Sequence, residues 1–128
     1  MAFESFAHVP VTEELLRHVW EGEADPAKGG HRHGLGREGK TEFPEEWTLM
    51  TVTEAILATL AHPQSIHVYE ERTFLLREVK QVILQIEMRK LAGGFTIKSV
   101  FPVCGEGVFR NQKGRRQLLP LDISVMES

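Results

Sequence analysis

The sequence predicts an α+β fold in which N-terminal helices pack on an antiparallel β-sheet. Two observations lead to this prediction. Helical periodicity is confined to the first half of the chain, whereas β-branched and aromatic residues are frequent from residue 65 onward. The 128 residues, 41% of them apolar, suffice for one core, so we expect residues 1–128 to form a single domain.

Two helices are predicted. The first is expected from Thr12 to Trp20, where Thr12 can cap the first turn and apolar residues recur at helical spacing. The second is expected from Thr51 to about Ala61, because Thr51 and Glu54 have the spacing of a capping box. The glycine-rich stretch between them has no periodicity, which is typical of a long functional loop.

Alternation with a period of two predicts strands between residues 65 and 90. The clearest run is 82–88, which has the pattern of a strand with one buried face. The positions on that face are Val82, Leu84, Ile86 and Met88, and they alternate with Ile83, Gln85 and Glu87. A Gly-Gly pair then separates this run from 95–102, which is typical of a hairpin. Further short strands are expected at 107–110 and 119–125, with an exposed basic turn at 111–117 between them.

Composition and charge exclude several classes of protein. The net charge of −3 counts against a non-specific polyanion binder. The segment 28–40 is nevertheless cationic, which suits a compact anionic target such as one or two phosphates. No signal peptide and no apolar run near the roughly 20 residues of a membrane span is visible, so we expect a soluble protein. The lone Cys104 cannot form an internal disulfide.

Two imidazoles are candidates for acid–base chemistry. His18 comes at the end of the first helix, and His31 follows the pair Gly29-Gly30. With ordinary pKa values near 6.5, one ring can be neutral and the other charged, as base and acid for the cleavage of RNA. An ammonium at Lys40 could stabilise the charge on the phosphate oxygens, and the N–H of Gly30 could approach those oxygens closely.

The stretch "HVWEGEADPAKGGHRHGLGREGKTEFPEEWT", residues 18–48, resembles the bacterial EndoU ribonuclease domain of polymorphic and contact-dependent toxins. That family has a helix-borne histidine, then "GGH…G", then "GK[ST].FP..W" and a helix. "SVFP", residues 99–102, is similar to its "T.YP" strand motif. The resemblance covers about 12–108 and leaves 109–128 as a basic turn followed by a C-terminal strand or tail.

The resemblance implies His18 and His31 as the catalytic pair and Lys40 as the third member, with Lys80 or Lys98 as alternative sources of the ammonium. Ser99 takes the position of a hydroxyl that contacts the phosphate or the uracil base.

Other residues are implied as substrate contacts. Phe101 stands where the family has tyrosine, which keeps the stacking face but lacks the phenol. The remaining expected contacts are Gly30, Arg32, His33 and Lys98.

The implied activity is cleavage of single-stranded RNA, including tRNA, without a metal or other cofactor. The products would be a 2′,3′-cyclic phosphate and a 5′-hydroxyl end, with a preference for uridine. The implied fold is that shared by barnase, EndoU, colicin and RelE-like ribonucleases. A cognate immunity protein is an expected partner, whereas DNA and membranes are not. Such a domain would act in the cytoplasm, either where it is made or after delivery as part of a larger toxin.

Two alternatives stay open at this point. Because Phe101 lacks the phenol, the chain could be an RNA-binding module that has lost its activity. The H-x-H spacing of His31 and His33 could instead complete a three-histidine zinc site with His18, as in a metal-dependent hydrolase.

Overall fold

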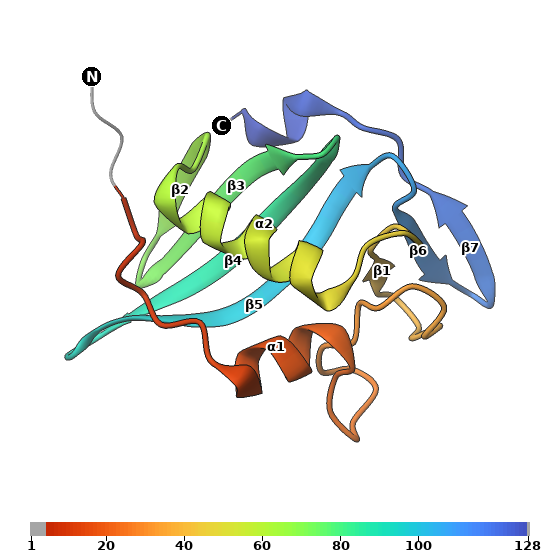
Figure 1. Cartoon of the computed structure of the whole chain (residues 1–128), viewed down its shortest axis with the longest axis horizontal. Coiled ribbons are helices and arrows are strands. Elements are labelled where there is room, and N and C mark those ends of the chain that lie inside the picture. Colours follow the sequence, from red (N-terminus) through yellow and green to blue (C-terminus); the bar gives the residue numbers. More distant parts are fainter. Residues whose placement is uncertain (1–4, 128) are drawn as a thin grey trace.

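The computed structural model describes residues 5–127 (Figure 1). In chain order its elements are α1 (Glu13–Trp20), β1 (Thr41–Glu42), α2 (Leu49–Ala61), β2 (Ser65–Tyr69), β3 (Arg72–Val79), β4 (Val82–Leu91), β5 (Gly94–Gly105), β6 (Phe109–Gln112), β7 (Arg115–Leu118) and the 3-10 helix η1 (Ile123–Met126). Neither helix of this described part is long and apolar enough to cross a bilayer.

The strands form two antiparallel sheets, and with the two helices they confirm the predicted α+β class. The large sheet is the meander β2-β3-β4-β5, and the small sheet has the order β1-β6-β7. Figure 1 shows α2 crossing one face of the large sheet, while α1 lies along the β5 edge. The hairpin predicted at the Gly-Gly pair is confirmed as the connection between β4 and β5.

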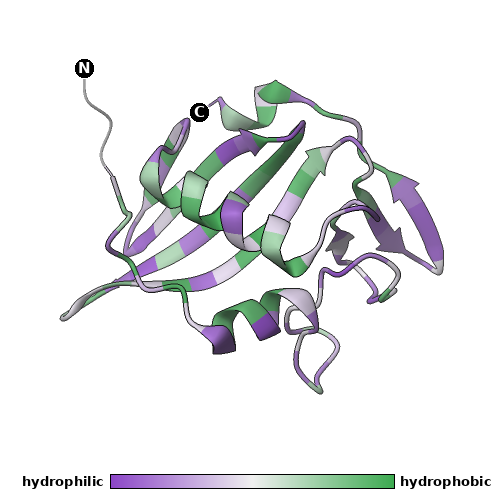
Figure 2. Cartoon of the chain, in the orientation of Figure 1, coloured by the Kyte–Doolittle hydropathy of each residue, from purple (hydrophilic) through white to green (hydrophobic). Residues whose placement is uncertain are grey.

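The main core lies between α2 and the large sheet. The alternation predicted for β4 is confirmed over residues 82–88, where the even-numbered positions are fully buried: Val82, Leu84, Ile86 and Met88. They share one apolar cluster with four residues of α2, namely Val52, Ala55, Ile56 and Leu60. The hydrophobic (green) positions of α2 and the sheet can be followed in Figure 2. Each such side chain contributes about 1.5–3 kcal/mol of transfer free energy on burial.

The opposite face of the large sheet is apolar only at one end. A second cluster there includes Leu76, Ile83, Cys104, Val125 and Met126, the last two from the C-terminal segment. Farther along, Glu87 of β4 pairs with Ser99 of β5, so this part of the face carries polar side chains. Both residues are half-buried, and the sheet therefore presents a polar surface beside its β5 edge.

The predicted start of the second helix was wrong. Helix α2 begins at Leu49, and its N-cap is Thr48 rather than Thr51. The Thr48 hydroxyl accepts a hydrogen bond from the Thr51 N–H at 3.2 Å, and the Thr48 N–H donates to the Thr51 hydroxyl at 3.3 Å. The capping box thus joins two threonines, which leaves Glu54 exposed within the helix.

The C-terminal prediction was also wrong in part. The segment predicted as a basic turn at 111–117 contains most of strand β7, and the turn itself is only Lys113 and Gly114. Both have positive φ, 53° and 74°, as a two-residue hairpin turn requires. The strand predicted at 119–125 is absent from the described residues, because Asp122 caps the 3-10 helix η1 there.

The long loop after α1 is held against the end of that helix. The N–H groups of Gly30, His31 and Arg32 donate to the carbonyls of His18, Val19 and Trp20 at 3.0, 2.8 and 3.1 Å. The loop thereby satisfies carbonyls that the last turn of α1 would leave without partners. The glycines permit this approach, since a Cβ on Gly29 would overlap the His18 carbonyl oxygen.

We expect Gly29→Ala to lower the free energy of unfolding by about 2–3 kcal/mol, because a positive φ of 71° adds to the overlap with backbone. Gly36→Ala is the matched control, since Gly36 has a φ of 73° with open space around it. In Gly36→Ala only the cost of a Cβ at positive φ, about 1 kcal/mol, should remain. Urea denaturation of both variants measures the difference, and equal losses would contradict the packing role of Gly29.

Candidate active site

His31 is fixed from both sides of its backbone. Its N–H donates to the Val19 carbonyl of α1, and its carbonyl accepts from the Phe43 N–H at 2.8 Å. The segment therefore lies between the end of α1 and the residues that follow β1. Its side chain is turned inward, with only 6% of the residue exposed.

The His31 ring has one engaged nitrogen and one aromatic partner. Nδ1 lies 2.7 Å from the Thr41 carbonyl oxygen, which can only accept, so Nδ1 carries the proton and Nε2 is the basic nitrogen. The ring stacks on Phe101 of β5 with centroids 5.8 Å apart and planes inclined by 24°. Phe43 meets the ring edge-on at 6.5 Å. These contacts fix both the tautomer and the plane of the ring.

Burial lowers the pKa of His31 from 6.5 to about 4. The hydrogen bond to Thr41 acts in the opposite direction, whereas the positive charges of Lys40, His18 and Arg37 lower the pKa further. His31 is therefore neutral at physiological pH. A neutral imidazole with a free Nε2 can accept a proton.

His18 lies on α1 in a more open position. Its Nδ1 is 2.8 Å from Glu23 Oε2, and its side chain is 25% exposed. Since the carboxylate engages Nδ1, Nε2 is left to exchange a proton. The ring lines a cleft of about 560 Å³ between α1 and β5, whose far wall includes Thr96 and Lys98.

The two histidines thus face the same edge of the large sheet. His31 stacks on Phe101, and His18 lines the cleft against the preceding residues of β5. The two rings are near enough for the charge of His18 to lower the pKa of His31. The structure brings the predicted pair together at β5.

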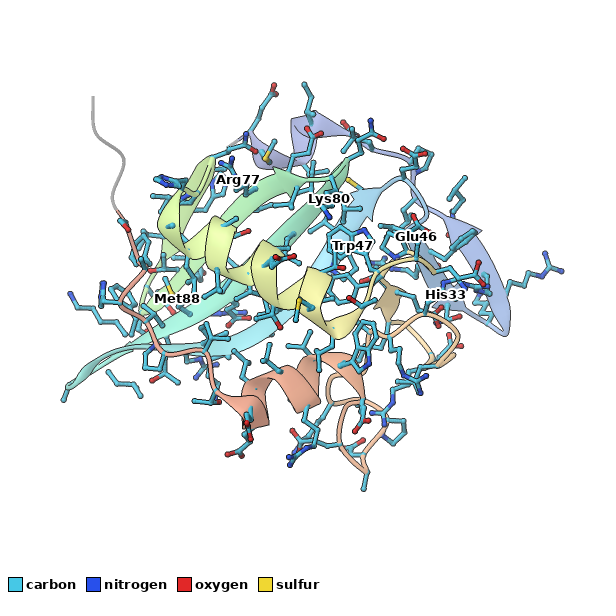
Figure 3. The ribbon with its side chains drawn as sticks, in the orientation of Figure 1. His33, Glu46, Trp47, Arg77, Lys80 and Met88 are labelled. Atoms are coloured by element: carbon cyan, nitrogen blue, oxygen red, sulfur yellow. The ribbon has the colours of Figure 1, made fainter. Side chains whose placement is uncertain are left out.

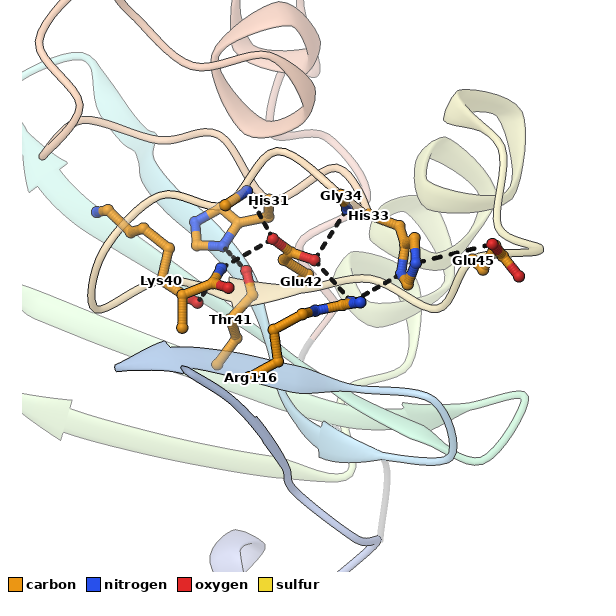
Figure 4. A network of polar contacts seen from close by, with 10 residues as sticks. His31, His33, Gly34, Lys40, Thr41, Glu42, Glu45 and Arg116 are labelled. Atoms are coloured by element: carbon orange, nitrogen blue, oxygen red, sulfur yellow. Dashed lines mark hydrogen bonds and ion pairs between the residues drawn. The ribbon is translucent and has the colours of Figure 1, made fainter. Parts of the chain in front are cut away.

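The three candidate lysines differ in their positions. Lys40 is near enough to His31 for its charge to act on the ring, and Figure 4 shows its side chain extending on the Nε2 side. Lys98 lies on the His18 cleft. Lys80 is in the exposed turn between β3 and β4, and Figures 1 and 3 show it on the side of the large sheet remote from α1. Lys40 is therefore the best placed.

Ser99 lies on the polar face of the sheet. It is part of a row of contacting side chains that the sequence did not reveal: Ser99, Glu87, Arg72 and Phe74. Its Oγ is 3.4 Å from Glu87 Oε1, and the other Glu87 oxygen accepts from Arg72 Nε at 2.9 Å. The guanidinium of Arg72 also lies 5.2 Å from the centre of the Phe74 ring. The only signal for this row was the alternation of β4, which places Glu87 opposite the core face.

Several predicted contacts have other roles in the structure. The Gly30 N–H, expected to approach a phosphate, donates instead to His18. His33 lies 3.9 Å from Glu45 and 3.3 Å from Arg116, beside the small sheet (Figure 3). The side chain of Arg32 is exposed.

The three-histidine zinc site left open by the sequence is not formed, because His33 is turned away from the pair. Within residues 5–127 no three His, Cys, Asp or Glu side chains come close enough together to hold a metal ion.

Glu42 anchors the loop that contains Gly34 and Gly36, a role that no sequence pattern indicates. Its carboxylate is 1% exposed and accepts four hydrogen bonds of 2.8–3.0 Å (Figure 4). The donors are Gly34 N, Gly36 N, Asn111 Nδ2 and Arg116 Nη2. Burial alone would raise the pKa of Glu42, but these donors together hold it below its ordinary value. The carboxylate therefore ties the loop before Lys40 to the β6–β7 hairpin.

Comparison with protein families, with curated proteins and with solved structures finds no match for this chain. The geometry of the site and the resemblance of its motifs are what bear on function.

The lowered pKa of His31 predicts a pH-dependent stability. Between pH 6.5 and about 4 the unfolded chain binds a proton that the folded chain does not, so stability falls as the pH falls through this window. The loss is about 3 kcal/mol by the pH 4 end. We expect urea denaturation to show this decline in wild type and a shallower one in His31→Gln, which has no imidazole. Parallel curves would contradict the neutral, buried state of His31.

Proposed function

We propose that this chain is a metal-independent endoribonuclease that cleaves single-stranded RNA by transesterification. The observation that carries the proposal is the environment of His31. Its ring is neutral and its tautomer is fixed by Thr41, and the charges of Lys40 and His18 are close enough to lower its pKa. The EndoU-like order of the motifs supports the same reaction.

In this proposal His31 is the general base. Nε2 takes the proton of the ribose 2′-hydroxyl, and O2′ attacks the adjacent phosphorus. Protonated His18 is the general acid, because Glu23 holds its Nδ1 and leaves the Nε2–H to protonate the departing 5′-oxygen. The phosphorus–O5′ bond breaks as the phosphorus–O2′ bond forms. The products are a 2′,3′-cyclic phosphate and a 5′-hydroxyl end.

Three further groups complete the proposed site. The ammonium of Lys40 stabilises the negative charge on the non-bridging phosphate oxygens. Phe101 is stacked under His31 and orients that ring, while the hydroxyl of Ser99 is a contact for the base or the phosphate. A uridine preference and a tRNA substrate follow from the resemblance, as does a role as a bacterial toxin or effector with an acidic immunity protein as partner.

The test is to incubate a labelled, uridine-containing single-stranded RNA with wild type and with His31→Ala in the presence of EDTA. We expect wild type to produce 2′,3′-cyclic phosphate ends and His31→Ala to produce none above background. RNA that is bound but left intact by wild type would favour the RNA-binding module. Cleavage that EDTA abolishes would favour a metal-dependent hydrolase.

A further inference from the structure

The hairpin β6–β7 has two faces of different character. In an antiparallel ladder, side chains alternate between the faces, and partners in register lie on the same face. One face carries Phe109, Asn111, Arg116 and Leu118. Asn111 and Arg116 both bind Glu42, and Arg116 lies over the Phe109 ring at 4.5 Å. Three of the four side chains on this inner face are thus engaged in contacts within the protein, whereas Leu118 is 51% exposed.

The outer face carries only guanidinium groups and side-chain amides. Its side chains are Arg110, Gln112, Arg115 and Gln117, and all four are exposed. Lys113 adds a third cation at the turn and is also exposed. Residues 109–118 contain no acidic side chain, and none of the ion pairs found within residues 5–127 involves these three cations. Figure 2 shows both strands as a hydrophilic (purple) unit.

The position of this outer face relative to the candidate active site is fixed. Arg110 pairs with Thr41 in the ladder between β1 and β6, next to Lys40. The Lys40 carbonyl accepts from Asn111 N at 3.0 Å, and the Gly39 N–H donates to the Asn111 carbonyl at 2.6 Å. A chain bound on the hairpin would therefore be held in one place relative to Lys40 and His31.

Charges on an edge strand also prevent sheets from pairing edge to edge, and that role needs no ligand. It does not account for a cation in the turn. The Glu38 carboxylate accepts a hydrogen bond from the Lys113 backbone N–H at 2.8 Å, but within residues 5–127 it forms no ion pair with the three cations. The chain as a whole carries −3, so three unpaired cations on one surface are a local exception. Such a surface attracts a polyanion.

We propose that the outer face of the β6–β7 hairpin, formed by Arg110, Gln112, Lys113, Arg115 and Gln117, binds the phosphate backbone of the RNA beyond the cleaved bond. This inference rests on the proposed function and adds an extended substrate to it. The protein then binds a long single strand more tightly than a dinucleotide, although both react at the same site.

The test compares Arg110→Gln/Lys113→Gln/Arg115→Gln with the control Lys80→Gln/Arg89→Gln/Lys90→Gln. Both remove three exposed cations, and both include one lysine with positive φ in a hairpin turn. The first readout is fluorescence anisotropy with a 2′-O-methyl oligouridine of about 20 nucleotides. This probe cannot be cleaved, because it has no 2′-hydroxyl to attack. Equal urea midpoints would show that both variants are folded.

We expect the hairpin variant to bind this probe at least about tenfold more weakly than the control variant. The slope of log affinity against log salt should fall by about 2, because each lost phosphate contact on a single strand contributes about 0.7. Cleavage of a dinucleotide such as UpA should be unchanged, since that substrate is too short to reach the hairpin. Weaker cleavage of UpA by the hairpin variant would instead indicate a disturbed catalytic loop and overturn the proposal.

Failure of this inference can be distinguished from failure of the proposed function. Wild type that cleaves neither UpA nor a long RNA overturns the nuclease, while the anisotropy measurement still tests the hairpin. Equal affinities of the two variants for the oligouridine overturn the hairpin proposal alone. A hairpin variant that keeps its affinity for the oligouridine but loses affinity for polyglutamate overturns it in favour of an acidic protein partner.

Discussion

The double variant His18→Ala/His31→Ala is expected to cleave RNA no more slowly than the slower of its two parent single variants. Each single substitution should reduce kcat/KM by about 10²–10⁴, the usual range for a general acid or base. In the proposed mechanism the two imidazoles serve one transition state and each needs the other to complete the proton transfers, so the losses should not multiply. Single-turnover rates for wild type and the three variants measure this directly.

His8→Ala is the control for these measurements. His8 is exposed and belongs to neither the cleft nor the stacked rings, so its removal should leave the rate unchanged. Multiplicative losses in the double variant would mean that the two histidines act in separate steps. A His18→Ala variant with wild-type activity would remove His18 from the mechanism, and Lys98 on the same cleft would then be the next candidate for the acid.

Glu42→Ala is expected to lower the free energy of unfolding by about 3–5 kcal/mol, the usual effect of removing one partner from a buried ion pair. The substitution removes the acceptor of two backbone N–H groups, of Asn111 and of Arg116. Arg116 is partly exposed and can find water, whereas Asn111 is buried and would keep an amide without its partner. Chemical denaturation monitored by tryptophan fluorescence measures the loss.

Glu45→Ala is the matched control for Glu42→Ala. Glu45 is three residues away and highly exposed, and its carboxylate lies 3.9 Å from the ring of His33. Its removal should change stability by less than about 0.5 kcal/mol. Similar losses in both variants would contradict the anchoring role of Glu42. Loss of RNA cleavage in Glu42→Ala under conditions where the protein stays folded would show that the anchor also positions the loop of His31 and Lys40.

Local patterns allowed most of the large sheet and both helices to be predicted. The β4–β5 hairpin has alternating apolar positions and turns at Ala92-Gly93, beside the predicted Gly-Gly pair, and α1 begins at the N-cap that its sequence indicates. The start of α2 was missed because Thr48 and Thr51 are both good caps three residues apart, and the earlier one adds a turn. Strand β7 was missed because its four residues are all exposed and show no alternation.

The sequence predicted those site residues that belong to short motifs, but not the contacts between residues that are distant along the chain. The resemblance selected His18 and His31, and the structure places both at β5. It could not indicate the stacking of His31 on Phe101, because those residues are distant in sequence. Glu42 was missed for the same reason. Next to Phe43 it looks like any surface glutamate, and its burial depends on Asn111, 69 positions later.

That separation in sequence bears on the order in which the molecule assembles. The meander β2-β3-β4-β5 pairs strands that are neighbours along the chain. The ladder between β1 and β6 must instead close a loop that consists of residues 43–108. Closing a long loop has a large entropic cost, which favours late formation of that ladder. On refolding from denaturant, the β-sheet signal should therefore recover first. The proposed RNA cleavage would be the last property to return, since the environment of His31 depends on the final strand pairing.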